Sequence, residues 1–311
     1  MLRSPADIYR TGGNAMDKEK FKGIFPALLT PFDSDGNVNT DSIEKLMGYC
    51  MEHGVRGFYI CGSSAEVFLL EKEEREEIYR KCAKFGAGKT TLISHVGDMS
   101  VKRAVEYAKL CESLGYDAVS AVTPFYFKYT DRQIIDYYKT LAGLVDIPVL
   151  LYHIPARSGV TLNESAFDEL LSDDRFLGVK FTSNDYFAFE RLRSKFPDKI
   201  FYNGYDEMLL CGLAMGADGA IGTTYNFMPQ RAAAIYEKAK ENDFSGALEY
   251  QRRLNDVIDF SIKSGSVIAA MKYAVSGKLG IDMGTCRAPG GDIDGEWKKA
   301  FDLRFTDESQ P

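Results

Sequence analysis

The sequence predicts a (β/α)8 TIM barrel followed by a helical C-terminal extension. Eight short, mostly apolar runs alternate with longer segments of helical character, and their starts are 34, 34, 27, 31, 28, 23 and 19 residues apart. This spacing fits βα units, because a crossover between parallel strands needs a helix. The predicted strands are Gly23–Leu29, Gly57–Cys61, Thr91–Val96, Ala118–Val122, Val149–Tyr152, Leu177–Phe181, Ile200–Asn203 and Gly219–Gly222.

The character of the runs and of the segments between them supports this fold. Strands that are buried on both faces are apolar throughout rather than alternating, as these runs are. The predicted helices include Ser42–His53, Glu73–Phe85 and Val101–Leu114. We expect Gly54, Gly86, Gly115 and Gly216 to end helices in the left-handed conformation. A doubly wound open sheet is the alternative, although no GxGxxG motif follows the first strand.

The sequence divides into three parts. Residues 1–20 form a polar N-terminal extension, within which Met16 is an alternative start. The barrel is expected over 21–240. Residues 241–311 form the helical C-terminal extension, packed on the barrel or on a partner chain, and helices are predicted at Gln230–Glu241, Phe244–Lys263 and Val267–Lys278.

Composition excludes several functional classes. The formal net charge of −7 argues against a nucleic-acid-binding protein, and no apolar stretch reaches the roughly 18 residues of a membrane helix. Residues 1–20 lack the apolar centre of a secretory signal. The six cysteines are scattered, which favours reduced thiols in a cytoplasmic protein. The three histidines form no HExxH motif, so we expect no metal site.

The most informative residue is a lysine near the end of the sixth predicted strand. The active site of this fold lies at the C-terminal strand ends, and lysine is rarely buried without a partner or a function. Strand alternation places Lys180 and Thr182 on one face and Val179 and Phe181 on the other. If the bulky pair faces the helices, Lys180 faces the barrel mouth, where a desolvated neutral amine can attack a carbonyl. The alternative is a lysine that extends to solvent.

Other strand ends supply further candidates, each with a plain structural alternative. Tyr152 ends the preceding strand, within reach of Lys180, and a phenol can shuttle a proton; it is otherwise a core tyrosine. Ser63 and Ser64 offer hydroxyls to a carboxylate or simply form a turn. Asp206 and Glu207 bind substrate or cap a helix. His95 is expected in the core, and His153 should point away from Tyr152.

These residues together resemble the N-acetylneuraminate lyase and dihydrodipicolinate synthase family of class I aldolases. The resemblance extends over about residues 21–304. It rests on the motifs Ala27–Phe32, Gly62–Ser64, Tyr152-x-Ile154-Pro155, Val179–Thr182 and Tyr202–Glu207. It implies an eight-stranded barrel with a helical extension, a homotetramer, and no metal or organic cofactor.

The resemblance also implies a role for each candidate. Lys180 forms a Schiff base with a keto acid, Tyr152 shuttles protons, and Ser63 and Ser64 bind the carboxylate. The positions that hold sugar hydroxyls in the lyase branch match Gly204, Asp206, Glu207 and Thr223, and Thr182 is typical of that branch. Tyr126 matches a tyrosine that contacts the neighbouring subunit's site.

The implied reaction is reversible cleavage of N-acetylneuraminate to N-acetylmannosamine and pyruvate, so the partner is a small keto acid or sugar acid. The alternatives are dihydrodipicolinate synthase, another pyruvate aldolase, or a non-catalytic sugar-binding or regulatory barrel. Two residues depart from the lyase pattern. Ala65 stands where the family has glycine, and it strains the loop if that position requires positive φ. Arg157 matches a substrate-binding arginine of the synthase branch.

Overall fold

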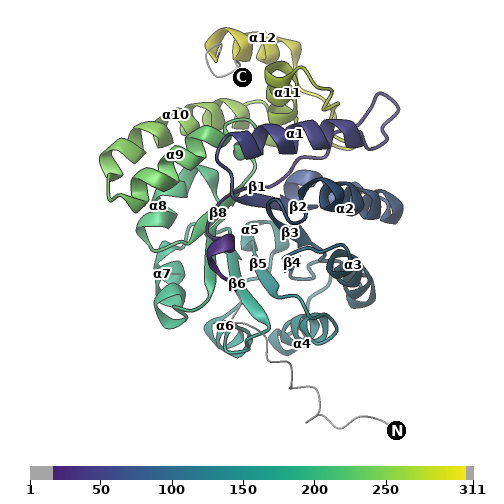
Figure 1. Ribbon diagram of the computed structural model, residues 1–311, viewed down its shortest axis with the longest axis vertical. Coiled ribbons are helices and arrows are strands. Elements are labelled where there is room, and N and C mark those ends of the chain that lie inside the picture. The colour runs from purple at the N-terminus through teal and green to yellow at the C-terminus, as the bar shows by residue number, and fades with distance from the viewer. Residues whose placement is uncertain (1–16, 306–311) are drawn as a thin grey trace.

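A computed structural model describes residues 17–305 of the chain, which contain a barrel of eight parallel strands (Figure 1). From β2 to β8 each strand pairs with the next in sequence, and β1 pairs with β8. Backbone hydrogen bonds from Arg56 N to Ile24 O (2.8 Å) and from Leu28 N to Tyr59 O (2.9 Å) join β1 to β2 and close the ring. The strands are β1 Gly23–Pro26, β2 Gly57–Ile60, β3 Thr91–His95, β4 Ala118–Val122, β5 Val149–His153, β6 Phe176–Phe181, β7 Ile200–Asn203 and β8 Gly219–Gly222.

All eight predicted strands are present, and the barrel prediction is confirmed. The first strand is shorter than predicted, because regular pairing ends at Pro26 and Ala27 forms only an isolated bridge with Tyr59. The helices are α1 Thr40–Glu52, α2 Lys72–Gly86, α3 Val101–Ser113, α4 Asp131–Ala142, α5 Pro155–Ser158, α6 Glu164–Leu171, α7 Tyr186–Lys195, α8 Leu209–Ala214, α9 Pro229–Lys240, α10 Phe244–Ile262, α11 Val267–Leu279 and α12 Gly295–Arg304.

The glycines predicted to end helices behave as expected with one exception. Gly54, Gly115 and Gly216 have positive φ. Gly86 ends α2 as predicted, but its expected left-handed conformation was wrong, because Gly88 takes the positive φ instead. A Cβ at Gly86 would lie 3.0 Å from the Leu92 side chain, so this glycine permits close packing between α2 and β3.

The apolar residues form two cores. Alternate strand residues fill the barrel interior, among them Phe25, Leu150 and Tyr202. The opposite faces, including Val179 and Phe181, pack against the surrounding helices. All six cysteines are free.

An irregularity in β6 determines which residues face the barrel interior. Leu150 of β5 pairs with Gly178, whereas the preceding Val149 pairs with Phe176, so Leu177 is an extra residue in the ladder. Leu177 lies in the interior core, yet Val179 lies in the helix-facing core. The bulge therefore shifts the alternation and turns Lys180 inward, with Tyr152 as its register partner on β5.

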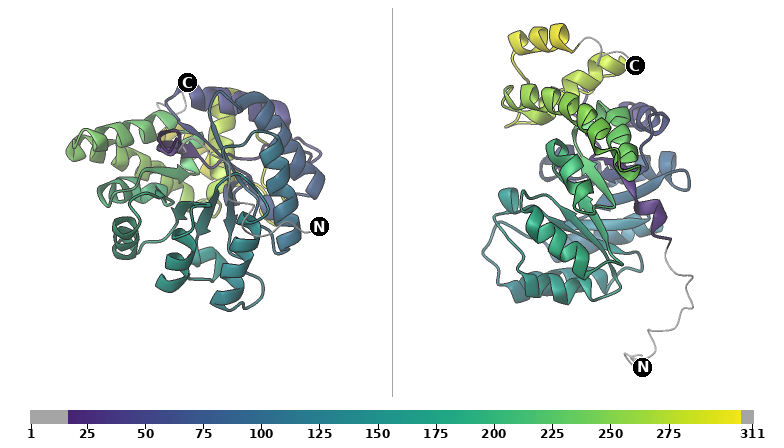
Figure 2. Two further views of the ribbon diagram at one scale, coloured as in Figure 1. Left: turned by 60° about the horizontal axis from the view of Figure 1, so that its bottom comes forward. Right: turned by 90° about the vertical axis from the view of Figure 1, so that its left-hand side faces the viewer.

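The C-terminal helices α10 and α11 pack at the end of the barrel beside α9 and α1, and α12 lies furthest from the strands (Figures 1 and 2). The sequence analysis predicted α10 and α11 but not α12. Trp297 and Phe301 of α12 pack on Phe260 of α10, and the Trp297 indole donates to the Phe260 carbonyl at 3.0 Å. Within residues 17–305, no helix has the length and apolar character needed to cross a membrane. Most of the predicted 1–20 extension, including Met16, lies outside the described residues.

We predict that Gly178→Ala destabilises the protein. An alanine Cβ would lie 1.8 Å from the Ile200 carbonyl oxygen, at a φ of +155° that L residues rarely adopt. Overpacking of this kind lowers the free energy of unfolding by about 1–3 kcal/mol. Gly277→Ala is the matched control, because a Cβ at this helical glycine meets nothing within 4 Å and should stabilise by about 0.5–1 kcal/mol. Urea unfolding midpoints measure both effects, and equal midpoints would contradict the prediction.

Candidate functional site

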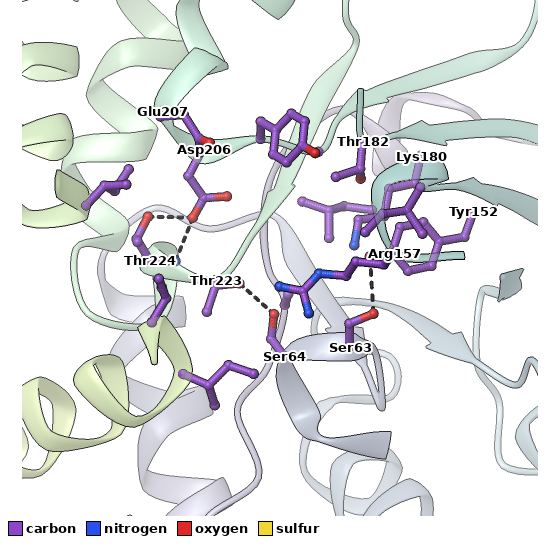
Figure 3. Close-up of a pocket in the computed structure, with 18 of the residues that line it drawn as sticks. Ser63, Ser64, Tyr152, Arg157, Lys180, Thr182, Asp206, Glu207, Thr223 and Thr224 are labelled. Carbon is purple, nitrogen blue, oxygen red and sulfur yellow. Dashed lines mark hydrogen bonds between the residues drawn. The ribbon is translucent and has the colours of Figure 1, made fainter. Parts of the chain in front are cut away.

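A cavity of about 210 Å³ opens at the C-terminal ends of the strands, where the fold places active sites (Figure 3). It brings together the candidates that the sequence singled out at five strand ends. Its polar lining consists of Ser63, Ser64, Tyr152, Arg157, Lys180, Thr182, Gly204, Tyr205, Asp206, Glu207, Thr223 and Thr224. Of the predicted site residues, all but Tyr126 line this cavity.

Lys180 extends its amine into the barrel between two aromatic rings. The side chain is 4% exposed, and its Nζ lies 3.9 Å from the Tyr152 ring centroid and 4.4 Å from that of Tyr59. Within the described part of the chain, no carboxylate forms an ion pair with it. The aromatic faces attract an ammonium ion more weakly than a carboxylate does. The amine is therefore held between aromatic rings and not by a counter-ion.

The Tyr152 hydroxyl lies between Lys180 and the loop after β2. Its oxygen is 3.4 Å from Ser63 Oγ, and Figure 3 shows the two side chains converging on the cavity. The pKa of Tyr152 lies below its ordinary value. Burial raises the pKa, but the charge of Lys180, hydrogen bonds with Ser63 and Lys180, and the charge of Arg157 together outweigh burial. This phenol is suited to gain and lose a proton during a reaction.

The loop after β2 presents two serines to the cavity. Ser63 and Ser64 begin a short 3-10 helix, and Ser64 Oγ lies 2.6 Å from Thr223 Oγ1 of the loop after β8. The condition for strain at Ala65 is not met, since Ala65 is not among the residues with positive φ. The next residue, Glu66, is left-handed with φ 58°, and so is Cys61 at the start of the loop with φ 54°.

Glu66 is held in this conformation by the C-terminal helices. Its carboxylate lies 2.6 Å from Lys272 Nζ of α11, and the side-chain exposures of the pair are 4% and 0%. The same carboxylate accepts a hydrogen bond from Arg287 N at 2.8 Å. Burial lowers the pKa of Lys272, and the charge of Glu66 opposes this shift. The serine loop is thus fixed by an ion pair that no solvent screens.

Thr182 and Gly204 meet at the ends of β6 and β7. A Cβ at Gly204 would lie 1.9 Å from Thr182 Oγ1, so only glycine leaves room for this hydroxyl. Among the described residues, Thr182 Oγ1 is buried and has no hydrogen-bond partner. A buried hydroxyl without a partner is available to a ligand.

Asp206 and Glu207 lie across the cavity from Lys180 and Tyr152 (Figure 3). Asp206 is buried, and its Oδ2 accepts hydrogen bonds from Thr224 N (2.7 Å) and Thr224 Oγ1 (2.6 Å). Burial raises the pKa of Asp206 to about 6, against the opposing effect of these hydrogen bonds. Glu207 is half-buried, and Asn255 of α10 donates to its carbonyl at 3.1 Å.

The barrel, the inward lysine and the paired tyrosine can be compared with known proteins. A family model described as the Dihydrodipicolinate synthetase family matches residues 20–306. The chain belongs to this family. It is 40% identical to the N-acetylneuraminate lyase of Clostridium perfringens over 269 residues, which is 86% of this chain and 93% of that protein. It is 38% identical to that of Fusobacterium nucleatum over 86% of this chain and 92% of that protein.

The solved structures of family members agree with this. The structure of CdNal from Clostridium difficile in complex with mannosamine has a TM-score of 0.89 and 36% identity, and covers 92% of this chain and 99% of that chain. The structure of N-acetylneuraminate lyase from Fusobacterium nucleatum complexed with pyruvate has a TM-score of 0.86 and 36% identity, over 92% and 98% of the two chains.

Two predicted residues stand apart in this member of the family. Arg157, on α5, lines the cavity near Tyr152 and is exposed, and its guanidinium has no hydrogen-bond or ion-pair partner among residues 17–305. Tyr126 lies in the loop after β4, 77% exposed and packed on Phe127, so it does not enter the cavity of its own chain. His95 and His153 are both buried, and His153 faces the helices beside Phe167, as predicted.

The sequence analysis did not select Tyr59, which flanks Lys180, or Tyr205, which lines the cavity, and it missed two further parts of the site. Thr224 was present among the strand-end residues but was not selected, although it partners Asp206. An apolar wall from α10 and α11 was not anticipated, because nothing local to these helices shows where they pack; it consists of Ile258, Ile262, Val267 and Ile268. In the described part of the chain, no group of three or more His, Cys, Asp or Glu residues is arranged to hold a metal ion.

We predict that Lys180→Met raises the pKa of the Tyr152 phenol. The substitution removes the positive charge that favours the phenolate, while burial continues to favour the neutral phenol. NMR titration of ring-labelled tyrosine, assigned with Tyr152→Phe, measures the change. Lys263→Met, at an exposed position, is the control. A pKa of Tyr152 that is unchanged or lower in Lys180→Met would contradict the role of the lysine charge.

Proposed function

We propose that this protein is an N-acetylneuraminate lyase that cleaves its substrate reversibly to N-acetylmannosamine and pyruvate. The observation that carries the proposal is the buried Lys180 amine beside the Tyr152 hydroxyl, in a cavity whose opposite side bears Asp206 and Glu207. The names of the relatives from Clostridium perfringens and Fusobacterium nucleatum support it. So do the mannosamine and pyruvate in the related structures.

The chemistry begins with attack of the neutral Lys180 amine on the keto carbon, which loses water to give an imine. Tyr152 removes the proton of the hydroxyl on C4. The C3–C4 bond breaks, its electrons pass into the protonated imine to form an enamine, and the aldehyde of N-acetylmannosamine leaves. The enamine then takes a proton at C3, and water releases pyruvate and regenerates the amine.

The remaining side chains are assigned to the two ends of the substrate. Ser63 and Ser64 bind the keto-acid carboxylate with hydroxyl and backbone donors. The hydroxyl chain is bound by Thr182, Gly204, Asp206, Glu207 and Thr223. Carboxylates suit this end, because each accepts several strong hydrogen bonds from hydroxyl groups.

One observation favours a second activity. Arg157 is an unpaired cation at the cavity wall, and the synthase branch uses an arginine at the matching position. A short acidic aldehyde would meet Arg157, but it would leave Asp206 and Glu207 without hydroxyl partners. We therefore place the lyase reaction first. A non-catalytic barrel has no need for both Lys180 and Tyr152.

The resemblance to the family supports a proposal for the assembly and the location of the protein. We propose a homotetramer in the cytoplasm that uses no cofactor and acts on a small sugar acid. Tyr126, exposed on its own chain, reaches the cavity of a neighbouring subunit in this arrangement.

We predict that the purified protein releases pyruvate from N-acetylneuraminate and scarcely condenses pyruvate with aspartate semialdehyde. Glu207→Gln should impair cleavage more than imine formation with pyruvate, because pyruvate does not extend to Glu207. The loss of a hydrogen bond to a charged group corresponds to an effect of about tenfold to hundredfold. Efficient synthase activity without lyase activity would overturn the assignment and make Arg157 decisive.

We predict that borohydride with pyruvate inactivates the enzyme by reducing an imine at Lys180. Peptide mapping locates the adduct, and borohydride without pyruvate is the control, because a free amine is not reduced. An adduct at another buried lysine such as Lys272, or full activity in Lys180→Ala, would exclude the mechanism.

We predict that light scattering gives a mass about four times that of the 34.7 kDa chain. A fully active monomer would refute the role of Tyr126 at a neighbour's site.

A further inference from the structure

The carboxylate of Asp206 faces the cavity and also accepts hydrogen bonds from neighbouring residues of the chain. One oxygen, Oδ2, accepts both the N–H and the O–H of Thr224, at 2.7 and 2.6 Å. The other oxygen lies against Gly222, where a Cβ would approach within 2.2 Å of Oδ1. The absence of a side chain at Gly222 therefore permits this placement. A residue that served only to bind substrate hydroxyls would not need these contacts.

Thr224 connects Asp206 to the opposite side of the cavity. The preceding residue, Thr223, places its Oγ1 2.6 Å from Ser64 Oγ (Figure 3). The loop has a second anchor in Asn226, whose side-chain amide donates to Ala27 O (2.9 Å) and Thr223 O (2.8 Å). The position of the Ser64 hydroxyl thus depends on a loop that Asp206 and Asn226 hold from two sides.

We propose that Asp206 is a positioning residue for the keto-acid end of the site. It fixes Thr224, the adjacent Thr223 is fixed with it, and Thr223 in turn orients the Ser64 hydroxyl toward the substrate carboxylate. The inference deepens the proposed function and rests on it. A carboxylate suits this role, because hydrogen bonds to a charged acceptor are about twice as strong as neutral ones.

The binding of pyruvate alone distinguishes this positioning role from a role in sugar binding. It has a keto group and a carboxylate but no hydroxyl chain, so a residue that only binds the chain leaves pyruvate binding untouched. A residue that positions Ser64 affects pyruvate directly, from the far side of the cavity.

The experiment measures the pyruvate concentration that gives half-maximal borohydride trapping at Lys180. Thr224→Val removes one donor to Asp206 and keeps the side-chain shape, and Asp206→Asn removes the charge. Each should raise this concentration about tenfold, and the double variant should exceed neither single variant by much, because both act through one path. Thr224→Ser, which keeps the hydroxyl, should remain within about twofold of the wild type.

Thr91→Val is the matched control for a lost buried hydroxyl. Thr91 Oγ1 donates to Lys20 O at 2.8 Å, at the start of β3 and so at the opposite end of the barrel. The Thr91→Val variant should reach half-maximal trapping at the same pyruvate concentration as the wild type. Thermal unfolding of all variants verifies that they are folded.

If Thr224→Val or Asp206→Asn reached half-maximal trapping at the same pyruvate concentration as the wild type, the inference would be overturned, while the chemistry of Lys180 would remain intact. Equal weakening in Thr91→Val would also overturn it, because the effect would then reflect general destabilisation. Failure of the wild type to form any adduct would instead refute the proposed function on which the inference rests.

Discussion

The rest of the site is arranged around the burial of one amine. Moving a lysine side chain into a barrel removes the water that solvates its charge, and most proteins offset that cost with a carboxylate. Here the rings of Tyr59 and Tyr152 flank Lys180 Nζ instead. A close carboxylate would hold the amine in an ion pair that attack on a carbonyl would have to break. The acidic groups stand across the cavity, and in the proposed function Asp206 and Glu207 bind the far end of the substrate.

This arrangement needs rigid loops, and the C-terminal helices provide the rigidity. Lys272 of α11 holds Glu66 in the loop after β2. Gln251 of α10 donates to the Asp206 carbonyl at 3.0 Å, and Asn255 donates to the Glu207 carbonyl. A buried ion pair adds little net stability over an apolar pair, but removing one partner leaves an unpaired charge that costs about 3–5 kcal/mol. The pair therefore specifies one loop geometry.

The sequence predicted the features that depend on local pattern. Strand spacing identified the barrel, and alternation placed Lys180 and Thr182 inside and Val179 and Phe181 outside. That success depended on counting from Lys180 itself, because the bulge at Leu177 would have reversed an alternation counted from the start of β6. The expectations that failed concerned packing between segments that are distant in sequence, which a local pattern does not reveal. Gly86 ends α2 as expected but permits packing against β3 instead of adopting the left-handed conformation, and the left-handed conformation near Ala65 falls on Glu66.

In the proposed function, the residues of the cavity divide between the two reactants. Lys180, Tyr152 and the serine loop would act on the keto acid, which the lyase and synthase reactions share, so these residues do not identify the second reactant. That choice belongs to the loops after β7 and β8, to Arg157 on α5, and to the apolar wall of α10 and α11. Under the same proposal, Ile258 and Val267 in that wall exclude water on the side where a long substrate extends, which strengthens its hydrogen bonds to Asp206 and Glu207. Specificity is then set by α5, by the loops after β7 and β8 and by the C-terminal helices, whereas the chemistry takes place at β5, β6 and the loop after β2.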